Sequence, residues 1–382
     1  MSKDGKKRIG IWFGGCSPEY EVSLASASAV ISHINYEKYN VVLIGIDRKG
    51  NWYLYEGGLE GIQTDTWLAS EKVTPAAVTW NSHIDKGREE EKVQQQLLVF
   101  RPEGMETIRL DGALPILHGK NGEDGTLQGL LELAGIPILG CDTLSSALCM
   151  DKDRAHRLVQ HAGVKVPEAY TFSLKKNTAD YEKIFEKMMA EEVLPAAAKL
   201  GYPLFVKPVR AGSSFGISRV MSADELEDAL RKALQYDGNI ILEEAVRGFE
   251  VGCAVLGIQE LFLGEVDEIE LSEGFFDYTE KYTLKTSSIH VPARIPAETA
   301  ERIKDTARII YKTLGCTYFA RVDMFLTEEG EIYFNEVNTI PGFTSHSRYP
   351  NMMKAAGLSF FQLLERILDM GLADRDIGYG VS

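Results

Sequence analysis

Two segments near the C-terminal end of the chain carry charged and amide side chains at a spacing that suits metal binding. Arg321 and Asp323 lie two residues apart, as do Glu336 and Asn338. A tight turn over residues 329–330, with glycine in the left-handed position, would pair the two segments as a β-hairpin. In that register Asp323 faces Glu336. Arg321 likewise faces Asn338, so all four side chains share one face of the sheet.

Two carboxylates that face each other across a hairpin repel unless a cation offsets them. Opposed side chains have Cβ atoms about 4.5–5.5 Å apart, and like charges so placed destabilise a sheet. Mg²⁺ prefers oxygen ligands and is commonly held by one or two carboxylates together with substrate phosphates. The alternative is structural, with Arg321 forming ion pairs to both acids. The hairpin therefore predicts a magnesium site or a salt-bridged face, and the other loops of the chain favour one or the other.

A Gly/Ser-rich loop offers a site for phosphate groups. The segment VKPVRAGSSFG ends a predicted strand at Lys207, passes through Ser213 and Ser214, and returns to a strand over 216–220. Backbone N–H groups and hydroxyls in such a loop can cradle phosphate oxygens, and Lys207 adds a point charge. The segment is not a P-loop signature, and no helix follows it directly. An ordinary flexible hairpin loop is the alternative.

A second glycine-rich loop lies in the N-terminal part of the chain. The segment HGKNGEDGTLQG follows a predicted buried strand and leads into a predicted helix over 125–134, with His118 at the strand end. Open α/β sheets bind ligands at the carboxyl ends of their strands, and a helix N-terminus favours an anion such as a carboxylate. In the alternative, Glu123 and Asp124 only cap the helix and His118 fills the strand end.

Two further pairs of acids could bind the amino groups of a ligand. Glu19 and Glu21 follow the first predicted strand, and they could meet a ligand amine or stabilise the start of a helix. Glu243 and Glu244 end another predicted strand. There, acids and exposed backbone could hydrogen-bond an adenine amine and ribose hydroxyls, and solvated acids at a strand end are the alternative.

The elements that would position these loops change character near residue 146. Residues 8–46 predict a strand, a glycine turn, a helix and a second strand, which is a parallel βαβ start. Residues 51–106 are polar and show no clear periodicity. After residue 146 the strands are predicted to pair antiparallel. We therefore predict an α/β domain over 1–145 and α+β structure beyond it, divided near residue 240.

The composition excludes several classes of protein. The 382 residues carry a formal net charge of −15, which argues against a nucleic-acid or anionic-membrane surface. No apolar run reaches the length of a membrane span, and the N-terminus lacks the apolar core of a signal peptide, so a cytoplasmic protein is expected. The five cysteines form no CxxC pair and are expected to be reduced.

Eight motifs occur in order along the chain: FGGCSPEYEVS, LHGKNGEDGTLQG, CMDKDRAH, VKPVRAGSSFG, ILEEAVRGFEVGCAVLG, FFDYTEKY, ARVDMF and FNEVNTIPGFTSHSRYP. Together they resemble the D-alanine–D-alanine ligase family of the ATP-grasp superfamily, over nearly the whole chain. The resemblance implies a Rossmann-like (pre-ATP-grasp) substrate-binding domain over 1–145. It also implies an ATP-grasp fold of two antiparallel-sheet subdomains, a central one over 146–240 and a catalytic one over 241–382.

For ATP and metal, the resemblance implies three groups of residues. Lys152 and Lys207 would contact the phosphates, and Ser214 lies in the loop that would close over the transferred phosphoryl group. The adenine edge and the ribose would be held by Glu243, Glu244, Val246 and Glu250. Two Mg²⁺ ions, for which Mn²⁺ could substitute, would be held by Asp323, Glu336 and Asn338.

For the amino acids, the resemblance implies a pocket shared between the domains. Glu19 would bind the ammonium group of the first D-alanine, supported by Ser213 and Tyr282. Lys281 and Tyr282 belong to a loop that would close over the site, and His118 and Arg321 would lie near the first substrate. Arg321 and the backbone N–H of Gly342 would stabilise the tetrahedral oxyanion. Ser347 is a further catalytic candidate, and Arg348 is a candidate for binding the acceptor.

The implied reaction joins two D-amino acids for peptidoglycan precursors. ATP would phosphorylate the first D-alanine, and the amine of the second would displace phosphate from the D-alanyl phosphate. Housekeeping members usually carry Leu or Met where this chain has Arg348, and the last motif is closer to the vancomycin-resistance branch. Tyr282 argues against D-lactate as acceptor. D-alanyl-D-alanine is the expected product, with a D-alanine–D-serine ligase as the alternative.

Two other functions fit parts of the sequence. One is another ATP-grasp carboxylate–amine ligase, against which Glu19, Tyr282 and the SHS motif argue. The other is a nucleotide-binding regulatory module, which would not need Arg321 and the metal ligands. The expected partners are small-molecule D-amino acids and a second copy of the chain in a homodimer, with neither nucleic acid nor membrane.

Overall fold

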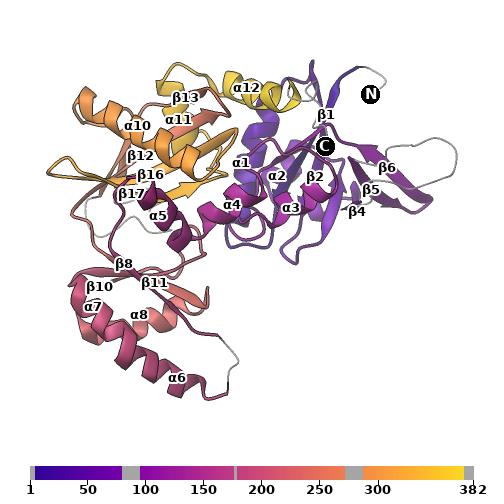
Figure 1. The fold of residues 1–382 in the computed structure, drawn as a ribbon. Helices are drawn as coiled ribbons and strands as arrows, with labels where there is room; N and C mark the ends of the chain where they lie inside the picture. Colours follow the sequence, from indigo (N-terminus) through magenta and orange to yellow (C-terminus); the bar gives the residue numbers. More distant parts are fainter. Residues whose placement is uncertain (1–4, 80–94, 176–178, 272–286, 374–382) are drawn as a thin grey trace, which may run out of the picture.

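The computed structural model describes residues 5–79, 95–175, 179–271 and 287–373, and the fold within these ranges is built on three sheets (Figure 1). The first sheet contains parallel strands, and the other two are antiparallel. The prediction that α/β structure is followed along the chain by α+β structure is therefore confirmed. Among the described helices, none is long and apolar enough to cross a membrane.

The first sheet begins with the predicted βαβ unit. Strand β1 (Lys7–Gly14) lies between β2 (Tyr39–Ile46) and β7 (Gly112–Pro115) and is parallel to both. Helix α1 (Tyr20–His33) connects β1 to β2. Because the carboxyl ends of β1 and β7 are adjacent, the loops that carry Glu19 and His118 start side by side.

The segment over 51–106, for which the sequence predicts no element, extends this sheet. Four strands continue it antiparallel in the order β6-β5-β4-β3: β3 (Trp52–Tyr55), β4 (Val73–Val78), β5 (Gln96–Arg101) and β6 (Gly104–Arg109). The strands have only four to six residues, and β6 is exposed along nearly its whole length. A strand exposed on both faces has no alternation of apolar residues, so its sequence carries no strand signal.

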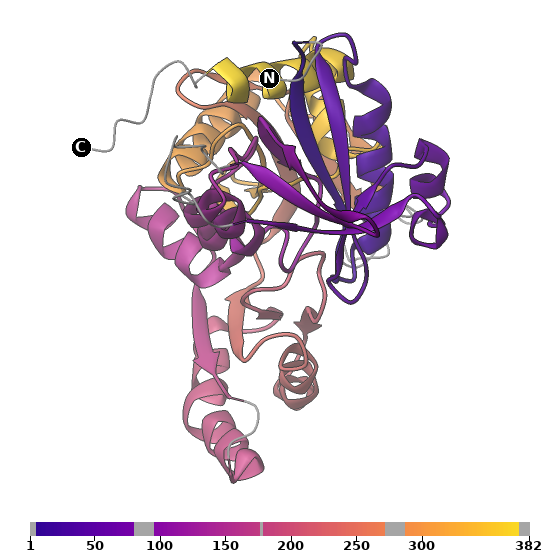
Figure 2. The same ribbon diagram turned by 90° about the vertical axis from the view of Figure 1, so that its right-hand side faces the viewer.

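The second sheet forms a separate lobe (Figures 1 and 2). Its strands pair in the order β10-β9-β11-β8 and comprise β8 (Ala169–Ser173), β9 (Leu204–Pro208), β10 (Ser218–Val220) and β11 (Asn239–Glu244). Three helices pack on it through a common apolar core: α6 (Tyr181–Met188), α7 (Leu194–Leu200) and α8 (Leu226–Ala233). Strand β11 continues past residue 240, where the sequence predicts a domain boundary, to Glu244.

The third sheet carries the predicted hairpin. Its strands pair in the order β15-β14-β12-β16-β17, with β13 beside β12. They are β12 (Gly248–Gly257), β13 (Leu261–Leu263), β14 (Asp267–Leu271), β15 (Ser287–His290), β16 (Phe319–Thr327) and β17 (Ile332–Asn338). Val251 and Cys253 pack into a core with helices α5 (Lys152–His161) and α10 (Ala297–Thr313). Glu250 and Gly252 therefore lie on the opposite face of β12.

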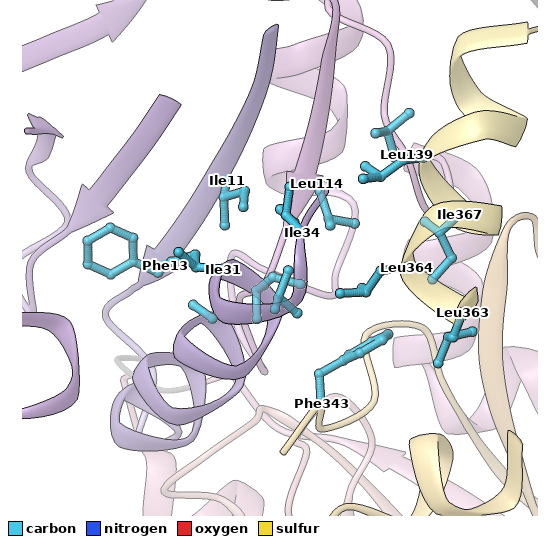
Figure 3. Packing of buried hydrophobic residues seen from close by; sticks show 14 of the residues in the cluster. Ile11, Phe13, Ile31, Ile34, Leu114, Leu139, Phe343, Leu363, Leu364 and Ile367 are labelled. Carbon is cyan, nitrogen blue, oxygen red and sulfur yellow. The ribbon is translucent and has the colours of Figure 1, made fainter. Parts of the chain in front are cut away.

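The C-terminal helices join the third sheet to the first. Helix α12 (Phe360–Ala373) packs Leu364 and Ile367 into the same apolar cluster as Ile11 and Leu114 of the first sheet (Figure 3). Phe343, from the loop after β17, lies in this cluster as well. Four further α-helices in the described ranges are α2 (Leu59–Gln63), α3 (Thr126–Leu133), α4 (Thr143–Met150) and α11 (Arg348–Ala355). The packing of Phe343 in this cluster holds the loop after β17 against the N-terminal domain.

Candidate active site

The β16–β17 hairpin has the predicted register where it carries Arg321 and Asp323, but its turn differs from the prediction. Asp323 pairs with Glu336, and Arg321 pairs with Asn338, as predicted. Near the turn, however, the loop has three residues, 328–330, closed by a hydrogen bond from the Thr327 N–H to the carbonyl of residue 331 at 2.9 Å. A bulge beside Asp323 adds one residue to β17 and restores the predicted pairing.

Asp323 is buried between two arginines. Nε and Nη2 of Arg321 donate to its carboxylate at 2.7–3.1 Å, and Nδ2 of Asn338 donates at 2.9 Å. On the other side, Nη1 of Arg348 lies 3.3 Å from Asp323 Oδ1. Glu336 has a different cation, since its carboxylate lies 3.7 Å from Nζ of Lys152. The repulsion between the facing carboxylates is therefore offset by separate cationic side chains.

The donor chemistry of this face fits magnesium. Asp323 and Glu336 contribute carboxylates. The amide oxygen of Asn338 is available as a metal ligand, because its Nδ2 is the atom that donates to Asp323. Mg²⁺ prefers such oxygen ligands and usually completes its shell with water and substrate phosphates. Within the described ranges, no group of three or more His, Cys, Asp or Glu side chains is placed to hold a metal ion on its own. Phosphate oxygens would therefore have to complete this site.

A cavity of about 540 Å³ lies between the second and third sheets. Phe205 and Ile217 line it from one side, and Phe249, Ile269 and Phe325 line it from the other, so its walls include flat apolar surfaces. All seven residues predicted to bind nucleotide line this cavity, together with Glu336: Lys152, Lys207, Ser214, Glu243, Glu244, Val246 and Glu250. The sequence motifs that carry them are spread over about a hundred residues, and the two sheets bring them together.

Glu243 forms a buried ion pair with Lys207 inside the cavity. Burial raises the pKa of the Glu243 carboxyl, but the charges of its neighbours, Lys207 foremost, together outweigh burial, so the pKa lies below its ordinary value. Oε2 accepts from Lys207, whereas Oε1 is buried without a hydrogen-bond partner among the described residues. A buried acceptor without a partner is costly. This oxygen could accept a hydrogen bond from a ligand amine.

The Gly/Ser loop of the second lobe contacts the N-terminal domain. The Ser213 hydroxyl donates to Glu19 Oε1, which joins two motifs separated by 194 residues. Ser213 and Ser214 both have positive φ, 49° and 58°, so the loop turns sharply where it meets Glu19. The predicted partnership of Glu19 with Ser213 is therefore present, whereas Lys281 and Tyr282 lie outside the described residues.

His118 binds the loop after β17. Its Nδ1 lies 2.8 Å from the carbonyl of Ile340, and its Nε2 lies 3.2 Å from Ser26 Oγ. Ser26 Oγ in turn accepts the N–H of Phe343 at 3.2 Å. Burial lowers the pKa of the imidazole to about 4, so the ring is neutral at pH 7. It then donates to Ile340 and accepts from Ser26.

Glu123 is a site residue that sequence reasoning assigned only to helix capping. Its carboxylate accepts the N–H of Gly119 at 2.8 Å and the N–H of Ile340 at 3.0 Å, so it joins the same two loops as His118. Burial, followed by the charge of Glu19, raises the pKa of Glu123 to about 8. Ile340 lies 217 residues away, and no local pattern could have predicted this contact.

The last motif folds into a tight loop followed by helix α11, which the sequence did not predict. Ser347 Oγ accepts the N–H of Thr344 at 3.0 Å, and it lies so close to Gly342 that a Cβ there would approach within 2.7 Å. Arg348, predicted to bind the acceptor, is buried and forms ion pairs with Glu250, Asp267 and Asp323. Asp267 was not among the residues that the sequence singled out.

Two facing antiparallel sheets with a cavity between them, joined to an α/β domain, define an ATP-grasp ligase. The family model described as D-ala D-ala ligase N-terminus matches residues 8–141, and the one described as D-ala D-ala ligase C-terminus matches residues 158–369. The chain belongs to the D-alanine–D-alanine ligase family, and it is an ATP-dependent ligase.

Its relatives include both resistance and housekeeping proteins. The vancomycin B-type resistance protein VanB of Enterococcus faecalis is 42% identical over 96% of this chain and 99% of that protein. The D-alanine–D-alanine ligase of Caldicellulosiruptor bescii is 39% identical over 96% of this chain and 95% of that protein. Among solved structures, the VanG D-Ala:D-Ser ligase from Enterococcus faecalis is 54% identical with a TM-score of 0.82, covering 96% of this chain and 99% of that chain.

Proposed function

We propose that this protein uses ATP to join D-alanine to a second D-amino acid, through a D-alanyl phosphate, and so supplies a dipeptide for peptidoglycan precursors. The contacts of Lys152 carry the proposal. Its Nζ donates to the carbonyl of Ala211 in the Gly/Ser loop at 2.9 Å and lies 3.7 Å from Glu336. One buried lysine thus joins the loop suited to phosphates and the carboxylates suited to a metal.

The first step activates a carboxylate, which will not accept an amine directly because its leaving group is poor. Glu19 and Ser213 hold the first D-alanine by its ammonium group. Lys152 and Lys207 neutralise the phosphate oxygens and align the γ-phosphoryl group with the substrate carboxylate. Magnesium, held by Asp323, Glu336 and Asn338, would supply further neutralisation of phosphate charge when bound.

The second step is attack by the amine of the acceptor on the acyl carbon. The Arg321 guanidinium and the backbone N–H of Gly342 stabilise the oxyanion that develops, and phosphate then leaves. The loop with Ser213 and Ser214 covers the reacting groups and keeps water from hydrolysing the acyl phosphate.

One comparison favours D-serine as the acceptor. The D-Ala:D-Ser ligase VanG is 54% identical to this chain, whereas a solved D-alanine–D-alanine ligase from Coxiella burnetii is 28% identical. A hydroxyl on the acceptor is discriminated only if the pocket offers it a hydrogen bond. D-Alanine as acceptor is the other candidate, and both use the same phosphoryl-transfer step.

A competition experiment tests the proposal. The enzyme is given ATP, Mg²⁺, D-alanine and D-serine in equal amounts, phosphate release is followed, and the dipeptides are resolved by mass. We expect phosphate release that requires D-alanine, with D-alanyl-D-serine as the main product. Glu336→Gln should slow release by about 10²-fold or more, whereas Glu298→Gln, at an exposed position of α10, should not. Wild-type protein that releases no phosphate with D-alanine would refute the ligase proposal.

A further inference from the structure

The β-bulge in the β16–β17 hairpin decides which residue of β17 faces Asp323. Near the turn, Met324 pairs with Phe334. Continued without interruption, this register would pair Asp323 with Asn335. The bulge makes Asn335 an extra residue, and Asp323 pairs with Glu336 instead. The bulge therefore brings the second carboxylate to the face that is proposed to bind magnesium.

A histidine from another element binds the bulged residue. Asn335 has no partner in the described pairing of β16 with β17. Its carbonyl oxygen lies 2.9 Å from Nε2 of His156 on helix α5. The His156 ring also meets the Phe334 ring edge to face, with the ring centroids 5.3 Å apart. His156 is only 4% exposed, so this hydrogen bond is shielded from water.

The protonation state of His156 fixes the direction of this hydrogen bond. Burial lowers the pKa of the imidazole, so the ring is neutral at pH 7. Nε2 must carry the hydrogen, because the Asn335 carbonyl can only accept. Nδ1 is then a bare acceptor, and it is buried without a hydrogen-bond partner among the described residues. A buried acceptor without a partner is costly, and an apolar side chain would pack here without that cost. The histidine is better explained by the bond that it donates to the bulge than by packing.

Helix α5 contacts the region of Glu336 at two points. Lys152 and His156 are four residues apart, so they lie on the same side of the helix, and both are buried. Nζ of Lys152 lies 3.7 Å from the Glu336 carboxylate, and His156 binds the residue before it. Ala155 and Val159 anchor α5 in the apolar core of the third sheet. One helix thus holds the backbone that precedes Glu336 and places a positive charge beside its carboxylate.

We propose that His156 is a positioning residue that holds the bulge at Asn335 and thereby keeps Glu336 opposite Asp323 for binding magnesium–nucleotide. The inference rests on the proposed function and deepens it. Without the hydrogen bond from His156, the backbone at Asn335 can relax towards the uninterrupted register, which turns Glu336 away from Asp323. The nucleotide also contacts cavity walls on β9 and β12, which this change leaves in place. The loss should therefore fall on the contribution of the metal to nucleotide binding.

Calorimetric titration with ADP, in Mg²⁺ and separately in EDTA, tests the inference without turnover. We expect His156→Asn to weaken ADP binding in Mg²⁺ by about tenfold or more, a loss typical of residues that support metal ligands. ADP binding in EDTA should be unchanged. His156→Gln should bind as wild type, because Gln Nε2 can replace the imidazole Nε2 as donor, whereas the shorter Asn cannot reach the carbonyl. His161→Asn, at the exposed C-terminal end of α5, is the matched control and should bind as wild type.

His156→Met gives a second test if His156→Asn does not fold, because Met adapts to a buried site and offers the carbonyl no N–H donor. It should lose the effect of Mg²⁺ on ADP affinity in the same way. In both variants the KM for ATP should rise more than the KM for D-alanine.

Three results would overturn the inference. One is unchanged ADP affinity in Mg²⁺ for the folded variants. Another is an equal loss of ADP affinity in Mg²⁺ and in EDTA, which would show that His156 only supports the cavity as a whole. The third is a loss in His156→Gln as large as that in His156→Asn, since the donor is then irrelevant. Failure of the ligase proposal is recognised separately, by absent phosphate release from the wild type with D-alanine.

Discussion

At the scale of single residues, the site contains buried ionisable groups whose partners come from distant segments. His118 is neutral because burial lowers its pKa, and the neutral ring can donate to the Ile340 carbonyl and accept from the Ser26 hydroxyl. Within the part of the chain that the structure describes, Glu243 keeps one oxygen without a hydrogen-bond partner, in the cavity where nucleotide is proposed to bind. The surroundings of each group hold it in one protonation state, neutral for His118 and charged for Glu243. The site is thereby prepared for a charged ligand.

The buried imidazole makes stability depend on pH. The folded pKa of His118 is about 4, below its ordinary value of 6.5, so the unfolded chain takes up this proton first as the pH falls. This contribution to stability is complete above pH 6.5 and is lost as the pH falls towards 4. Between pH 7 and 5 the wild type should lose about 2 kcal/mol more than His118→Asn does. Urea unfolding at both pH values measures this difference, and equal losses in the two proteins would contradict the neutral-ring assignment.

At the scale of elements, the site depends on loops and strand pairs that hold each other in place. The predicted hairpin pairs the correct residues even though its turn is one residue longer than predicted, because the bulge beside Asp323 compensates. The predicted register followed from placing the turn over residues 329–330. It holds for the pairs of Arg321 and Asp323, whereas the pairs over 324–326 are shifted by one residue. The bulge could not be predicted, because it depends on how β17 packs against the rest of the sheet.

Glu123 links two such elements, the loop after β7 and the loop after β17. Glu123→Ala removes the acceptor for the N–H groups of Gly119 and Ile340, and a buried amide without a partner costs about 1–3 kcal/mol. We expect a loss of that order in the free energy of unfolding, together with a higher KM for D-alanine. Denaturant unfolding and steady-state kinetics measure the two effects, with Glu103→Ala, at an exposed turn, as control. A variant as stable as the wild type would show that other groups or water satisfy these amides.

At the scale of the whole molecule, the site lies where three sheets meet. The inter-sheet cavity is walled by the second and third sheets, whereas Glu19 and His118 come from the first. The C-terminal helix α12 packs on the first sheet (Figure 3), so the C-terminal part of the chain and the N-terminal sheet share one apolar core. The relation between the two halves of the site therefore depends on this packing. The predicted homodimer stays a prediction.

Leu364 is fully buried in this shared core. Leu364→Ala should lower the free energy of unfolding by about 2–5 kcal/mol, because the substitution removes buried methyl groups and leaves a cavity. Leu144→Ala is the control, since Leu144 is 68% exposed and should change stability by less than about 0.5 kcal/mol. Thermal and urea unfolding of both variants provide the comparison, and equal stabilities would mean that α12 does not hold the domains together.

The amino-acid sequence, with the family resemblance that its ordered motifs carry, was enough to predict the fold class, the pairs at the Asp323 end of the hairpin and the residues that line the inter-sheet cavity. These depend on residue types and spacing within short segments and on the order of the motifs along the chain. Tertiary structure was needed for the partners of Arg348, the link from Glu123 to Ile340 and the strands of 51–106. Each of these depends on which distant segments meet, and on whether a side chain is buried when they do, which no local pattern records.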